Sequence, residues 1–136
     1  MLDIQKQIEY WHQSAVEDWQ VAQDLLAQGR IRHGLFFVHL SLEKLLKAAV
    51  CQHTQDLAPR LHNLVRLAEL TGLSWNETQI DTLAELNILN IEGRYPDMLQ
   101  IPPSLKTAQC YLEQATEVYQ WLMQQLFNPS VDTYVP

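Results

Sequence analysis

Hydrophobic residues recur every three or four positions along most of the chain, which is the spacing of one face of an α-helix. Charged and amide side chains fill the positions between them, and turn-forming residues separate the runs. Because the first two runs are joined by only a few residues around Gly29, we expect two antiparallel neighbouring helices. The pattern predicts helices over residues 3–27, 31–52, 61–70, 75–89 and 105–126.

The helix boundaries have recognisable signals. Ser74 and Glu77 have the spacing of a capping box, and Ser104 can cap the last helix. Glycine and proline interrupt the stretch 91–103, which we expect to be irregular. The sequence therefore predicts an all-α, antiparallel (up-and-down) bundle of four to five helices. We expect one domain over residues 1–127, followed by a tail at 128–136.

The second predicted helix is apolar nearly all round, yet it contains Glu43, Lys44 and Lys47. Charges in a buried helix are costly unless they are paired or used. Glu43 precedes Lys47 by four residues, the favourable order for an ion pair on one helix face. Arg32 and His39 fall on the same stripe at 100° per residue. This stripe is either a buried network or a binding site.

The net charge and its distribution along the chain indicate which class of ligand the protein could bind. The chain has 136 residues, 47% of them hydrophobic, and a net charge of −7, which disfavours non-specific DNA binding. The charge is uneven, however: residues 30–66 carry +4, whereas the flanking segments carry −4 and −7. An anionic ligand is therefore expected in the middle third.

Other signals point to a protein inside the cell. No signal peptide and no membrane-spanning run are evident, and two separated cysteines suit a reducing compartment, so we expect a cytoplasmic protein without a membrane partner. Cys51 and His53 lack a second pair of ligands at metal-binding spacing, so no metal is expected, and no cofactor motif is present.

Four short motifs occur in an order that resembles one known family. They are Ala15-Val16-Glu17-Asp18, Glu43-Lys44-x-x-Lys47-Ala48, His62-Asn63-Leu64 and Arg94-Tyr95-Pro96-Asp97. Together they resemble the HEPN domain, the higher-eukaryote and prokaryote nucleotide-binding domain, over about residues 5–126. The resemblance implies a compact helical bundle that commonly forms a homodimer. It also implies a role beside a minimal nucleotidyltransferase, often as a toxin–antitoxin pair.

The resemblance, taken with the charge pattern, suggests how a nucleotide such as ATP or GTP would bind. Cationic side chains are expected to contact its phosphates, Glu43 to orient Lys47, and Tyr95 to supply an aromatic surface. The expected phosphate-binding residues are Arg32, Lys44, Lys47 and Arg94.

Two alternatives remain open from the sequence. Many HEPN proteins are metal-independent ribonucleases with four to six residues between an arginine and a following histidine, but no such histidine follows Arg94. Arg32 and His39 have that spacing and are the alternative catalytic pair for RNA cleavage, although His39 is the better fit to a core histidine. His62 fits either a helix cap or a ligand contact. The last alternative is a module that only dimerises or docks a protein.

Overall fold

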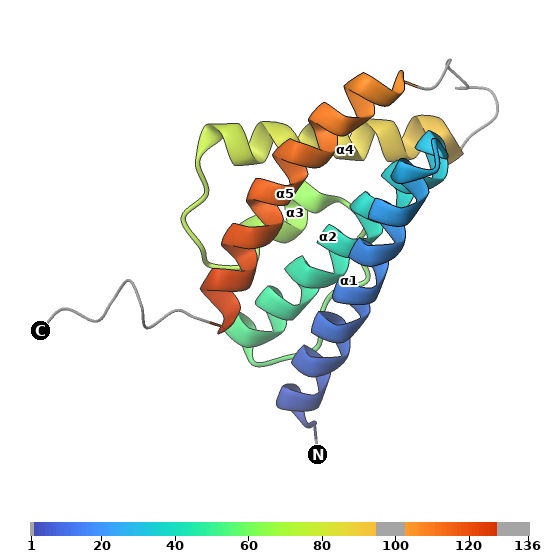
Figure 1. The fold of residues 1–136 in the computed structure, drawn as a ribbon. Helices are drawn as coiled ribbons and strands as arrows, with labels where there is room; N and C mark the ends of the chain where they lie inside the picture. Colours follow the sequence, from blue (N-terminus) through green and yellow to red (C-terminus); the bar gives the residue numbers. More distant parts are fainter. Residues whose placement is uncertain (1, 95–102, 128–136) are drawn as a thin grey trace, which may run out of the picture.

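The computed structural model describes residues 2–94 and 103–127, with only the backbone described at 91–94. Within these ranges the chain forms five helices and no strand (Figure 1). The predicted all-α helical bundle is confirmed. The helices are α1 (Ile4–Ala27), α2 (Ile31–Thr54), α3 (Leu64–Glu69), α4 (Glu77–Arg94) and α5 (Leu105–Phe127).

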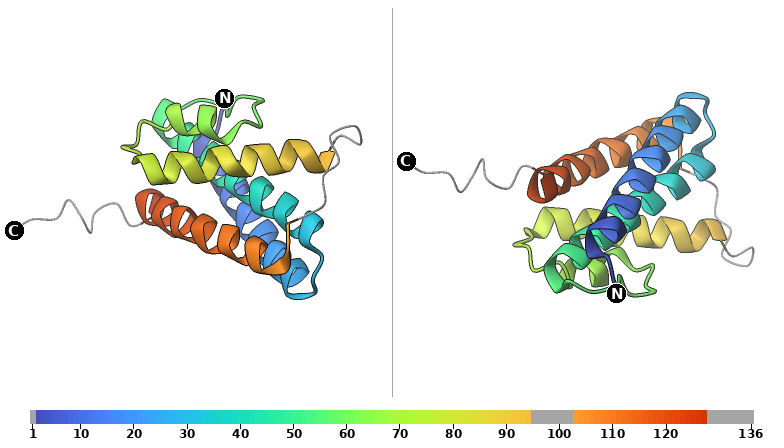
Figure 2. Two further views of the ribbon diagram at one scale, coloured as in Figure 1. Left: turned by 90° about the horizontal axis from the view of Figure 1, so that it is seen from above. Right: turned by 90° about the horizontal axis from the view of Figure 1, so that it is seen from below.

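Three long helices run alongside one another, and α4 crosses them (Figures 1 and 2). Helices α1 and α2 form an antiparallel hairpin, and α1 is also antiparallel to α5. Ring contacts between α1 and α5 fix this second direction: His12 lies on Phe127, and Trp19 stacks on Tyr119 with centroids 4.2 Å apart. Helices α2 and α5 consequently run in the same direction.

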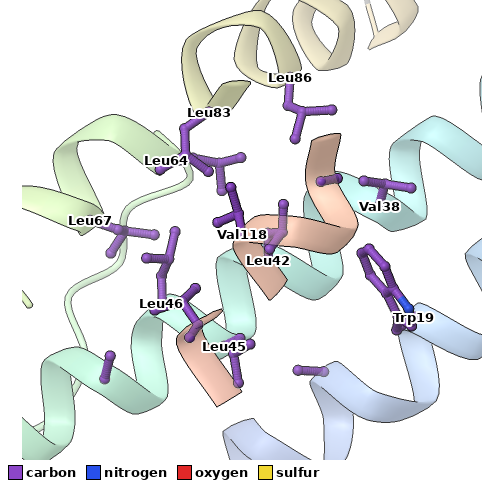
Figure 3. Close-up of a cluster of buried hydrophobic side chains, with 14 of the residues drawn as sticks. Trp19, Val38, Leu42, Leu45, Leu46, Leu64, Leu67, Leu83, Leu86 and Val118 are labelled. Carbon is purple, nitrogen blue, oxygen red and sulfur yellow. The ribbon is translucent and has the colours of Figure 1, made fainter. Parts of the chain in front are cut away.

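Helix α2 lies at the centre of the core (Figure 3). It contacts all four other helices, and from Ser41 to Cys51 every residue except the half-buried Lys44 is buried. Its leucines pack against a shell of apolar side chains from the other helices, including Trp19, Leu64, Leu67, Leu83, Leu86 and Val118. Any charge in this part of α2 must therefore find its partner inside the bundle.

The α1–α2 hairpin is tight at Gly34. A Cβ atom at this position would lie 2.6 Å from both Cγ and Cδ2 of Leu26, which is itself buried. The turn between the helices uses Gly29 with a φ of +78°, a conformation that glycine adopts easily. The absence of a side chain at Gly34 thus sets how closely the two helices approach.

The start of α4 differs from the sequence prediction. The capping box is formed by Asn76 and Gln79, whose side chains each accept a hydrogen bond from the other residue's backbone N–H, at 2.8 and 2.9 Å. The predicted box of Ser74 and Glu77 is wrong, because Trp75 donates a hydrogen bond back to Thr71 and keeps this part of the chain outside the helix.

Two other boundaries also differ. The structure continues α4 to Arg94, so residues 91–94 are helical rather than irregular; a glycine in a helix costs only about 1 kcal/mol relative to alanine. Helix α3 begins at Leu64, after an Asn63 cap, and is shorter than predicted. Ser104 does accept a hydrogen bond from the backbone N–H of Thr107, as expected of a cap. Tyr95, the rest of 95–102 and the predicted tail lie outside the described residues.

None of the helices in the described ranges combines the length and the apolar character needed to cross a membrane.

Candidate functional site: a polar cluster around Glu43

The carboxylate of Glu43 is the centre of a polar cluster inside the bundle. Its side chain is 6% exposed, and its Oε2 accepts from Lys47 Nζ at 3.2 Å and from His62 Nδ1 at 3.0 Å. The ion pair predicted from the spacing of Glu43 and Lys47 is present. A buried carboxylate is tolerable because these donors replace the water that it lost on folding.

His39 connects this cluster to α4. Its Nδ1 lies 3.8 Å from Oε1 of Glu43, and its Nε2 lies 3.2 Å from Oδ1 of Asn87. The amide group of Asn87 donates to Asn63 Oδ1 at 2.9 Å, so its oxygen must face His39 and accept. The ring is therefore protonated on Nε2. His39 is 3% exposed, in agreement with the core position favoured from the sequence.

His62 is the exposed end of the same cluster. Its side chain is 67% exposed, although its Nδ1 is bonded to the buried carboxylate of Glu43. Because a carboxylate can only accept, Nδ1 carries the proton of this hydrogen bond, and in the neutral form of the ring Nε2 holds the lone pair. A carboxylate that orients an imidazole in this way is a common arrangement in proton transfer. The cap of α3 is Asn63, which accepts from Arg66 N, and not His62.

Both lysines predicted to contact phosphate have carboxylate partners. Lys44 Nζ lies 2.7 Å from Asp18 Oδ2 and also 2.7 Å from Ser14 Oγ. Lys47 is 8% exposed, pairs with Glu43, and lies over the ring of Trp11 at 5.2 Å from its centroid. The ammonium group of Lys44 connects α2 to α1, whereas that of Lys47 pairs with a carboxylate on α2 itself. Each ion pair would have to open before its lysine could reach a phosphate.

The two arginines of the predicted site lie away from these lysines. Fifteen residues of helix, about 22 Å, separate Arg32 from Lys47. Arg32 instead precedes His39 by seven residues, and Arg94 follows Asn87 by seven, each a distance of about 10 Å along its helix. Both arginine positions lie on the same side of the His39–Asn87 contact, where the start of α2 approaches the end of α4 (Figures 1 and 2). The structure thus divides the predicted residues into two groups.

Sequence reasoning assigned no site role to the residues that complete the cluster, although Asp18 and Asn63 stand in the motifs quoted above. Asn63, Asn87 and Asp18 all bond to predicted residues or their partners, but they come from α1, α4 and the start of α3. A polar residue within an apolar run, as Asn87 is, was the available signal. In the described part of the chain, no group of three or more His, Cys, Asp or Glu side chains is placed to hold a metal ion.

The fold and this cluster define an all-α bundle with an internal polar network that reaches the surface at one histidine. A family comparison assigns the fold: the sequence model of the HEPN domain matches residues 8–126, and the chain belongs to the HEPN domain family.

A solved structure supports the same fold. The crystal structure of TT1696 from Thermus thermophilus superposes with a TM-score of 0.74 at 20% sequence identity, covering 88% of this chain and 98% of that one. No curated protein matches the sequence significantly.

Proposed function

We propose that this protein binds a nucleotide, or a partner that carries one, at the end of the bundle where α2 begins and α4 ends. Membership of the HEPN domain family supports a function related to nucleotides or RNA. The observation that carries the location is the placement of Arg32 and Arg94 at equal distances from the His39–Asn87 contact, on two facing helices. Two guanidinium groups on separate elements can bind phosphate from two directions.

Further features of this end favour an anion. The N-cap residue of α2 is Arg30, and its side chain makes no capping hydrogen bond. A long helix carries a partial positive charge at its N-terminus, where backbone N–H groups point outward. Arg30 and His33 are exposed beside it, and they belong to the positively charged middle third of the sequence. Tyr95, which follows Arg94 directly, would supply an aromatic surface for the base.

Titration with ATP, GTP and inorganic tripolyphosphate tests this proposal. We expect saturable binding by the wild type, weakened about tenfold or more in both Arg32→Ala and Arg94→Ala, since each loses a charged hydrogen bond. Arg66→Ala is the matched control, because Arg66 is exposed and paired with Glu69 on α3. Absence of saturable binding by the wild type would refute the proposal. Binding that is lost equally in the control would refute the location.

We further propose that the physiological partner is a small nucleotidyltransferase, in a pair of the toxin–antitoxin type, and that the HEPN chain forms a homodimer. The resemblance of the sequence to small prokaryotic HEPN proteins supports this part of the proposal. Co-expression with the product of a neighbouring reading frame, followed by size-exclusion chromatography, tests it. Separate elution of the two proteins at micromolar concentration would contradict the pairing.

A second candidate, metal-independent RNA cleavage, is favoured by the pairing of His62 with Glu43. The alternative pair from the sequence, Arg32 with His39, places its histidine inside the core, whereas His62 presents Nε2 on an exposed ring. General acid–base catalysis requires such access. Cleavage of single-stranded RNA in the presence of EDTA, lost in His62→Ala and retained in the conservative exposed control Arg66→Lys, would favour the enzyme over simple binding.

A further inference from the structure

A cavity of about 280 Å³ lies on another part of the molecule, between the last turns of α2 and α5 and the segment that joins α3 to α4. Its volume is near the lower end of the usual range for ligand sites, about 300–1,000 Å³, which suits one side chain or a small organic molecule. Its lining includes Gln52, His53, Leu73, Gln125 and Leu126.

Helices α2 and α5 run in the same direction, and both end at this cavity. Because α1 is antiparallel to both α2 and α5, the carboxyl ends of α2 and α5 lie at the same end of the bundle (Figure 1). Each helix carries a partial negative charge at its C-terminus, so the two contributions add here. The last turn of α5 contains no basic residue, and that of α2 contains only His53. In the described part of the chain, no lysine or arginine lines the cavity.

The lining provides both hydrogen-bond acceptors and apolar surface. The side chains of Gln52 and Gln125 carry amide oxygens, whereas Leu73 and Leu126 are apolar and at least half-buried. An amphipathic ligand would place its polar head against the amides and its alkyl stem against the leucines.

Gly72 fixes one wall of this cavity. A Cβ atom at this position would lie 2.4–2.6 Å from the imidazole atoms of His53, and the backbone has a φ of +74°. The ring of His53 can therefore lie directly against the chain only because this residue is glycine.

From the cavity, the converging helix ends and the amide oxygens, we propose that this site binds a guanidinium or ammonium group on an aliphatic stem, such as the side chain of an arginine in a partner. This site is separate from the proposed nucleotide site in both location and charge preference. A net charge of −7 on the whole chain favours the approach of a cation.

Three small probes test the charge requirement. N-acetyl-arginine amide carries the cation within a peptide-like frame, and N-acetyl-citrulline amide has nearly the same shape without charge. Agmatine carries the same guanidinium on a free small molecule, with an ammonium group in place of the peptide frame. We expect the arginine probe to shift the NMR signals of the Thr71–Leu73 amides and of the Gln52 and Gln125 side chains. The citrulline probe should bind about tenfold more weakly, because it lacks charged hydrogen bonds.

A substitution with a matched control tests the location. Gln52→Lys places a competing cation in the last turn of α2 and should abolish binding of the arginine probe, with an unchanged or raised melting temperature. Gln28→Lys makes the same change at the end of α1, away from the cavity, and should leave binding intact.

The outcomes separate clearly. Equal binding of the citrulline and arginine probes, or no shift at the cavity amides, would overturn the proposal, as would undiminished binding by Gln52→Lys. Tighter binding of agmatine than of the arginine amide would point to a free small-molecule cation as the ligand, whereas preference for the arginine amide would point to a protein side chain.

Discussion

Glu43 shows most clearly what a single residue contributes to this fold. Its carboxylate lies inside the bundle and receives hydrogen bonds from Lys47 and His62. Paired buried charges need not add stability by themselves, but each partner becomes a liability when the other is removed. The groups of the polar cluster therefore tolerate burial because each one is paired with another.

We predict that Glu43→Ala lowers the free energy of unfolding by about 3–5 kcal/mol, because it leaves Lys47 buried without its carboxylate. Urea denaturation of the variant and the wild type measures this loss. The double variant Glu43→Leu with Lys47→Met should lose much less, because no unpaired charge remains. Glu69→Ala, which breaks an exposed pair, should cost less than about 1 kcal/mol. An unchanged unfolding midpoint for Glu43→Ala would rule out this account.

His12 should make stability depend on pH. Burial lowers the pKa of His12 below its usual value, and the ring lies against Phe127 with its Nε2 lacking a partner among the described residues. As the pH falls through about 6.5, the unfolded chain takes up a proton that the folded chain resists, so stability decreases.

His12→Phe keeps a ring at this position and removes the titration. Unfolding measured at about pH 7.5 and about pH 5.5 should show a smaller decrease in stability for this variant than for the wild type. Equal decreases would mean that His12 does not contribute to the pH dependence.

Only some contacts of the candidate site could be predicted from the sequence. The spacing of Glu43 and Lys47 predicts their ion pair because both lie on one helix. The contact of His39 with Asn87 spans 48 residues, and that of Glu43 with His62 spans 19. No helical periodicity encodes contacts between separate elements, so these partners required the fold.

At the scale of the elements, the approach of α1 to α2 depends on a position without a side chain. Gly34→Ala would gain up to about 1 kcal/mol of helix propensity, but the new Cβ would meet Leu26 at 2.6 Å. Because Leu26 is buried and cannot move freely, the clash should outweigh the gain. We expect a net loss of about 1–3 kcal/mol, measured by thermal or urea unfolding.

Gly29→Ala provides the comparison. No neighbouring atom lies within 4 Å of the place where its Cβ would be, and its positive φ alone should cost about 1 kcal/mol. A Gly34→Ala variant more stable than the wild type would show that the hairpin can widen at little cost.

Helix existence was largely predictable, and helix ends were not. The runs over α1, α2 and α5 have long apolar faces, so their periodicity fixed them to within a few residues. Two overlapping capping patterns precede α4, and only the bond from Trp75 to Thr71 decides between them. Gly93 suggested an early end to α4, but one glycine is a weak signal against an otherwise helical segment.

At the scale of the whole molecule, the two cysteines differ in how far the fold must open before a reagent can reach them. Cys110 is exposed on α5, whereas Cys51 is fully buried, and burial raises the pKa of its thiol. Since the thiolate is the reactive form, a thiol reagent at about pH 7.5 should modify Cys110 quickly and Cys51 slowly.

The rate of labelling at Cys51 should rise with denaturant concentration, because a reagent can reach this thiol only when the core opens. Mass spectrometry of Cys110→Ser reports on Cys51 alone. Rapid labelling of this variant under native conditions would contradict the central position of α2.

The tight α1–α2 hairpin also has a consequence for how the protein is made. More than half of the buried hydrophobic side chains in the described part of the chain belong to these two helices, which contact each other across a very short turn. Contacts that are close in sequence form early, and chains emerge from the ribosome N-terminus first. Collapse can therefore begin while the last helix is still being synthesised, so that α5 meets a surface already shaped to receive it.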